Sequence, residues 1–133
     1  MTTTLLELPE QFAKLEGDIS AEKGDFSLFA MFRREDFPER WDLLISAPWA
    51  FADRESALDY FIAKIKSDIG PDGLVLLSRI IFIDPNDASL QKLNRAIPVE
   101  HGAVEVRDRN FFGLDIKHAV FITSKSLSAP TTA

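Results

Sequence analysis

The sequence predicts an α+β fold, a single-domain two-layer sandwich with about three helices on a mainly antiparallel sheet of about five strands. The first supporting observation is the stretch 41–70, where a strand-like alternation passes into an amphipathic helix. The second is the predicted element order, α-β-β-α-β-α-β-β, which contains two pairs of consecutive strands. Consecutive strands with short connections pair antiparallel, so most of the sheet is expected to be antiparallel.

The first helix is predicted to begin near Pro9, because proline suits the first position of a helix. Phe12, Leu15 and Ile19 then recur on one face of it. A start at Thr4, which offers a competing capping box, would place Pro9 inside the helix and remove a backbone hydrogen bond. The later start is therefore favoured.

Two strands follow. Residues 26–32 (FSLFAMF) are apolar at both alternations, which is typical of a central strand covered on both faces. The segment 33–40 (RREDFPER) is predicted to be a loop longer than a tight turn, joining an antiparallel pair. Trp41, Leu43 and Ile45 then alternate with less apolar residues, as in a strand with one deeper face, and Pro48 ends that strand.

The clearest helix begins after Asp53, whose carboxylate suits the N-cap, and ends at Gly70 before a proline. Its apolar residues recur with helical spacing and are predicted to form one buried stripe: Leu58, Phe61, Ile62, Ile65 and Ile69. The segment 74–83 is the most β-like of the chain and is predicted to be an interior strand. If this strand runs parallel to the one at Trp41, the helix is a right-handed crossover and the sheet is mixed.

The remaining elements are weaker. Asp84 as N-cap, with Pro85 at the first position, predicts a short helix that carries Leu90 and Leu93. Two strands are predicted at about 103–107 and 118–123, with Phe111, Phe112 and Gly113 in the loop between them. Residues 1–125 are expected to form the domain and 126–133 a flexible tail.

Composition narrows the function classes. A net charge of −6 argues against a protein that neutralises nucleic-acid phosphates, so no nucleic acid is expected as a partner. No stretch approaches the ~18 apolar residues of a membrane helix, and residues 1–12 show no secretory leader, so a cytoplasmic location without membrane contact is expected. The absence of cysteine excludes disulfides, a thiolate nucleophile and cysteine-based zinc sites. No cofactor is indicated.

One triplet suggests chemistry. On an extended segment, Asp115 and Lys117 point the same way, and Asp115-Ile116-Lys117 is similar to the acid-x-Lys element of restriction-type nucleases. That resemblance implies a divalent metal at the acid, water activation assisted by Lys117, and an upstream acid, for which Asp72 or Asp84 is available. The competing interpretation is an exposed sheet edge, where Asp and Lys discourage unwanted pairing. Without a second acid in a matching pattern, we predict no metal site.

Arg79 is the main anomaly, because a charge inside an apolar strand must be paired, turned outward, or face a partner or an anion. The favoured interpretation is an Arg paired with a nearby acid, or a bulge that turns it outward. His101 and His118, the only histidines, are expected to be solvent-facing or structural, because no triad or zinc spacing accompanies them.

Three aromatic residues complete the candidate binding set. Trp41 is assigned to the core, whereas Trp49 follows Pro48 at the end of its strand, where a surface position is equally compatible. Phe111 and Phe112 are predicted to form an exposed apolar patch. The favoured function is a non-enzymatic protein–protein interaction module that binds another protein or itself as a homodimer through Arg79, Trp49, Phe111 and Phe112. The alternative is a small metal-dependent hydrolase using Asp115, Lys117 and Asp84.

Overall fold

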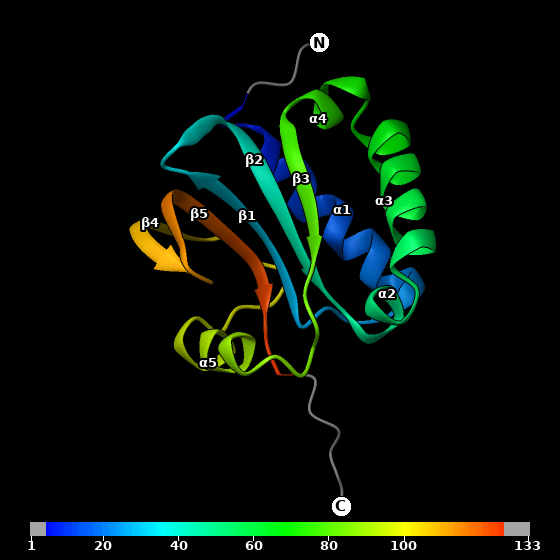
Figure 1. Ribbon diagram of the computed structural model, residues 1–133. Coiled ribbons are helices and arrows are strands. Elements are labelled where there is room, and N and C mark those ends of the chain that lie inside the picture. Colours follow the sequence, from blue (N-terminus) through cyan, green and yellow to red (C-terminus); the bar gives the residue numbers. More distant parts are fainter. Residues whose placement is uncertain (1–4, 127–133) are drawn as a thin grey trace, which may run out of the picture.

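The computed structural model describes residues 5–126, which form one five-stranded sheet in the order β3-β2-β1-β5-β4 (Figure 1). The β2–β3 pair is parallel and all other pairs are antiparallel, so the α+β class and the mixed sheet are confirmed. The strands are β1 (Leu28–Arg34), β2 (Phe37–Ser46), β3 (Leu77–Phe82), β4 (Val104–Phe111) and β5 (Leu114–Ser124). The predicted tail lies outside the described residues except for Ser126.

Helices cover both faces of the sheet (Figure 1). The main core lies between one face and helices α1 (Leu8–Lys23) and α3 (Arg54–Asp68). A second, smaller core lies between the other face and α5 (Ala88–Ala96), which adds a partial third layer. The central strand β1 contributes to both cores, because its alternate residues point to opposite faces. No helix among residues 5–126 is long and apolar enough to cross a membrane.

Helix α1 confirms the predicted apolar face, since Phe12, Leu15 and Ile19 are buried. The helix begins at Leu8, with Pro9 in its first turn. The same face also buries Glu16, an acid that the apolar pattern did not single out.

The connection between β1 and β2 corrects the prediction of a longer loop. Only Glu35 and Asp36 separate the two strands, so this is a tight hairpin. Pro38 lies in β2 near its first residue, where a missing N–H interrupts little of the ladder. The antiparallel pairing itself is confirmed.

Helix α3 is capped as predicted, because the Asp53 side chain accepts a hydrogen bond from the Ser56 N–H at 3.2 Å. Its buried stripe is narrower than predicted. Phe61 and Ile65 are fully buried, whereas Leu58 is 37% exposed. The apolar period of a helix defines the direction of its buried face but does not define how wide a strip of that face the sheet covers.

Two short helices, α2 (Pro48–Ala52) and α4 (Pro71–Val75), were not predicted. Each begins with a proline that the sequence pattern interprets as the end of a strand or helix, whereas proline is also compatible with the first turn of a helix. Because α4 takes up residues 71–75, strand β3 begins at Leu77 rather than near residue 74.

The predicted interior position of the 74–83 strand is wrong, because β3 lies at the edge of the sheet. The cap of α5 is also corrected. Asp87 is the N-cap and accepts from the N–H groups of Ser89 and Leu90, whereas Asp84 forms a turn by accepting from the Asn86 N–H at 2.9 Å. The buried residues of α5, Leu90 and Leu93, are as predicted.

The last two strands form a longer hairpin than predicted, with a two-residue turn at Phe112 and Gly113. Both turn residues have positive φ, 55° and 79°, which is the backbone geometry of the hairpin turns that match sheet twist. Phe111 therefore belongs to β4 rather than to a loop.

Candidate functional site

Arg79 lies on the edge strand β3, and its guanidinium is 2.8 Å from the carboxylate of Asp42. Asp42 is 1% exposed. The carboxylate oxygen that binds Arg79 also lies 3.1 Å from the Nε of Arg34. The hydrogen bond to Asp42 is the main cause of a raised Arg79 pKa, and burial opposes it. The predicted pairing of Arg79 with an acid is confirmed. Its guanidinium is paired with a carboxylate of the neighbouring strand, β2.

The two histidines lie apart and bind different partners. His118 is buried, and its Nε2 donates to a Glu105 carboxylate oxygen at 2.8 Å. Its Nδ1 is 3.3 Å from a guanidinium nitrogen of Arg33, which can only donate. Burial, more than any nearby charge, lowers the pKa of His118. The Nδ1 of His101 is 2.7 Å from buried Glu16, so both imidazoles tie elements of the fold together.

The residues of the hydrolase hypothesis do not lie together in one site. Asp115 is near the beginning of β5, and Asp84 follows the end of β3 at the opposite end of the sheet. The prediction that Asp115 and Lys117 mark a sheet edge is wrong, because β5 lies between β1 and β4. Within residues 5–126, no group of three or more His, Asp or Glu side chains is arranged to hold a metal ion.

The predicted binding aromatics mainly fill space between elements. Trp49 is partly buried and stacks on Phe61, with ring centroids 5.7 Å apart. Phe111 packs 5.3 Å from Phe32 on the second face of the sheet, and Phe112 is also partly buried there. The hairpin turn thus directs both rings toward the smaller core, and they do not form the open patch that the sequence suggested.

A different surface is left open along β3. Its sequence, LSRIIF, carries one charge, that of Arg79, and Asp42 holds it. As an edge strand, β3 directs the N–H and C=O groups of alternate residues outward. The side chains of Ile80 and Ile81 are only partly buried. This edge contains no proline. Its one charged side chain, Arg79, is 44% exposed and paired with Asp42, and its one register shift against β2 lies at Ser78, so the residues that follow Arg79 in the strand are apolar and regularly paired.

Helix α3 extends this apolar surface. Its Phe61 ring lies 6.1 Å from that of Phe82, which places the helix over β3. The side of α3 that carries Tyr60 faces α1, because the Tyr60 hydroxyl donates to Glu22 of that helix at 2.8 Å. Leu58 and Ile62 therefore lie on the side away from α1, toward the open edge, and neither belongs to the cluster that forms the main core.

We use the name β3 rim for strand β3 together with Leu58, Ile62 and Val75, the last of which is 60% exposed in the helix that leads into the strand. From the sequence, these side chains are predicted to lie in a buried helical stripe or in an interior strand. Only the position of β3 in the sheet reveals that they border an open edge.

In comparisons with known proteins, no family model, curated protein or solved structure matches this chain. The β3 rim is therefore interpreted from its own chemistry.

Proposed function

We propose that this chain is a protein–protein interaction domain whose partner is a second copy of itself, joined through the β3 rim. The observation that carries this proposal is the coincidence of an edge strand without a free charge and an apolar flank on the neighbouring helix. Edge strands of monomeric proteins are normally protected by charges, prolines or bulges. In β3 the one charge is paired with Asp42 and the one register shift lies at Ser78, so residues 80–82 are free of these features and suited to pairing.

Two copies of one strand related by a two-fold axis pair antiparallel, which makes the contact isologous and closed. An axis at Ile80 places that residue opposite its copy and Arg79 opposite Ile81. No like charges then lie directly opposite each other. The two α3 helices approach over the joined strands, so Leu58 and Ile62 of one copy meet those of the other.

The energetics require both parts of the β3 rim. Association costs on the order of 4–15 kcal/mol in lost translational and rotational freedom. Each new backbone hydrogen bond contributes about 0.5–1.5 kcal/mol net, so a short strand pair alone gives a weak contact. Burial of the flanking side chains, at about 0.8 kcal/mol per CH₂ group, raises the affinity into the micromolar range.

The test is the solution mass by light scattering after gel filtration. At about 100 µM, the wild type is expected at twice 14.9 kDa, because micromolar dimers are then mostly associated. The double variant Leu58→Glu, Ile62→Glu is expected at 14.9 kDa with an unchanged helical circular-dichroism spectrum, since neither side chain belongs to the core cluster.

The control is Val104→Glu, which places one Glu on an apolar residue of the other edge strand, β4, that is as exposed as Leu58. This variant is expected to remain dimeric. A monomeric wild type at high concentration, or a folded double variant that is still dimeric, would refute self-association through the β3 rim.

A further inference from the structure

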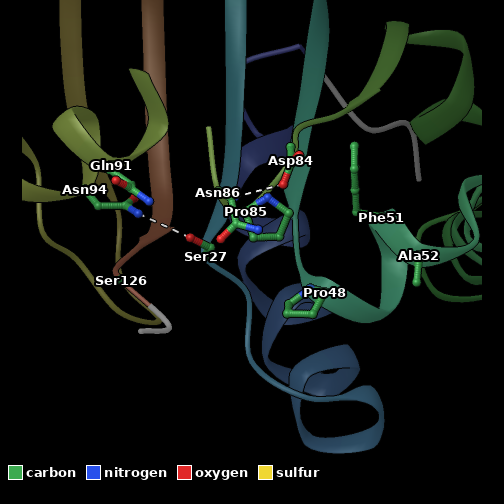
Figure 2. Close-up of a pocket in the computed structure, with 10 residues that line it drawn as sticks. All are labelled: Ser27, Pro48, Phe51, Ala52, Asp84, Pro85, Asn86, Gln91, Asn94 and Ser126. Atoms are coloured by element: carbon green, nitrogen blue, oxygen red, sulfur yellow. Dashed lines mark hydrogen bonds between the residues drawn. The ribbon is translucent and has the colours of Figure 1, made fainter. Parts of the chain in front are cut away.

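A cavity of about 440 Å³ opens between α2 and α5 at one end of the sheet (Figure 2). Phe51 of α2 lines one side, and Gln91 and Asn94 of α5 line the other. Asp84 and Asn86, from the loop after β3, lie between them in the view. Cavities of this size accommodate small molecules.

The topology explains why a cavity forms here. Strands β2 and β3 are the parallel pair, and both end at this side of the sheet. The chain leaves β2 toward α2 and α3 on one face, but it leaves β3 toward α5 on the opposite face. Where the connections from neighbouring parallel strands diverge in this way, they leave a crevice outside the carboxyl ends of the strands, which is the usual position of ligand sites in such sheets.

The charge of the lining selects the class of ligand. Asp84 is its one charged residue, and no Lys, Arg or His is among the residues that line the cavity. One Asp84 oxygen accepts from the Asn86 N–H, and the other has no hydrogen-bond donor among residues 5–126. Asp84 is solvent-exposed, and a carboxylate at the rim of a cavity whose lining includes no cation favours a positively charged ligand over phosphates and carboxylates.

The neutral groups complete the site. Asn94 is 6% exposed, and both polar atoms of its amide are hydrogen-bonded: Nδ2 donates to the Ser27 hydroxyl and Oδ1 accepts from Ser124. These bonds fix its side chain as one wall of the cavity. The exposed side-chain amides of Asn86 and Gln91 offer carbonyl oxygens that can accept from an ammonium group. Phe51, together with the neighbouring prolines of the lining, provides an apolar surface.

We propose that this cavity binds a small organic ammonium ion, with the ammonium group at Asp84 and the amide oxygens and the apolar body of the ligand against Phe51. The Phe51 ring offers the apolar body of the ligand a large contact surface. The guanidinium of Arg54 lies 4.4 Å from the centroid of this ring, but Arg54 is not among the residues that line the cavity. This site is separate from the β3 rim, so the proposal does not depend on self-association.

The test uses three probes with the same aromatic body: phenethylammonium, its neutral isostere 2-phenylethanol and the anion 3-phenylpropanoate. Binding is followed by ¹H–¹⁵N NMR, in which the side-chain amides of Asn86, Gln91 and Asn94 report directly on the cavity. Phenethylammonium is expected to shift these signals and to bind about tenfold or more tightly than the alcohol, and the anion is expected not to bind.

Asp84→Asn keeps a side-chain acceptor for the turn but removes the charge, and it is expected to abolish the preference for the ammonium probe over the alcohol. The control Asp59→Asn removes one exposed charge of α3 and should leave the preference unchanged, which separates the site from general attraction of cations by an acidic protein. Amide signals that no probe shifts, a stronger response to the anion, or an unchanged preference in Asp84→Asn would each overturn the proposal.

Discussion

The two edges of the sheet are built differently. β4 carries four charged residues between positions 105 and 109, and its pairing with β5 skips Asp108, whose φ is 55°. Charges are among the features that prevent an edge from pairing with another chain. β3 carries a single charge, which is paired with Asp42, and one register shift at Ser78. From this difference in charge we propose that β4 is protected against association and that residues 80–82 of β3 are available for it.

The largest expected effect comes from removing the acid that holds Arg79. Asp42→Asn leaves the guanidinium groups of Arg34 and Arg79 without the buried carboxylate that now binds both. Because Asp42 is buried whereas the Arg79 side chain is 44% exposed, the loss is expected to cost about 1–3 kcal/mol of unfolding free energy, measured by urea denaturation. It also frees a charge on β3, so the dimer should weaken.

The matched control is Asp36→Asn, because the Asp36 side chain is 76% exposed and lies 3.5 Å from Arg34. Its loss should change the unfolding free energy by at most about 1 kcal/mol. Equal effects of the two substitutions would contradict the role given to Asp42.

The second prediction removes the protection of β4. Replacing Arg107 and Arg109 by Val removes two of the four charges of this edge and gives it a more apolar surface. A chain with one open edge forms closed dimers, whereas a chain with two open edges can add copies at both ends. The variant is expected to form species larger than a dimer in sedimentation velocity. If its mass distribution matched that of the wild type, charge would not be what protects this edge.

The third prediction concerns pH, since Glu105 of β4 binds buried His118 of β5. The pKa of His118 is lowered in the folded state, mainly by burial. The unfolded chain therefore binds the proton more tightly, and the stability that neutral His118 contributes is present above about pH 6.5 and lost as the pH falls through the folded pKa. Urea denaturation across this range should show a smaller loss of stability in His118→Gln than in the wild type; parallel profiles would disprove the assignment.

The smallest expected effect is that of salt on the proposed dimer. Each copy carries a net charge of −6, so the two copies repel each other. The screening length falls from about 10 Å at 0.1 M to about 3 Å at 1 M, which weakens that repulsion. The dissociation constant from sedimentation equilibrium should fall a few-fold over this range. A constant that rises with salt would indicate an interface held by ion pairs instead of the apolar β3 rim.

The sequence by itself determined the local elements, because their signals lie within a few residues. Asp53 caps α3, and the spacing of Phe12, Leu15 and Ile19 gives the buried face of α1. Consecutive strands predicted the antiparallel pairs. A charge in an apolar strand was also sufficient to identify Arg79 as a residue that must be paired, turned outward, or face a partner or an anion.

Only the tertiary structure decided which elements are neighbours. An apolar strand has the same composition at the centre of a sheet and at its edge, so the position of β3 could not be read from its pattern. The partner of Arg79 is 37 residues away in the sequence, and no local spacing identifies it. Asp84 was assigned as a helix cap, and its place in a cavity follows from the divergence of two connections to opposite faces of the sheet. Hydrophobic periodicity records how deeply a residue is buried, whereas a site depends on which surfaces remain uncovered after distant segments have packed.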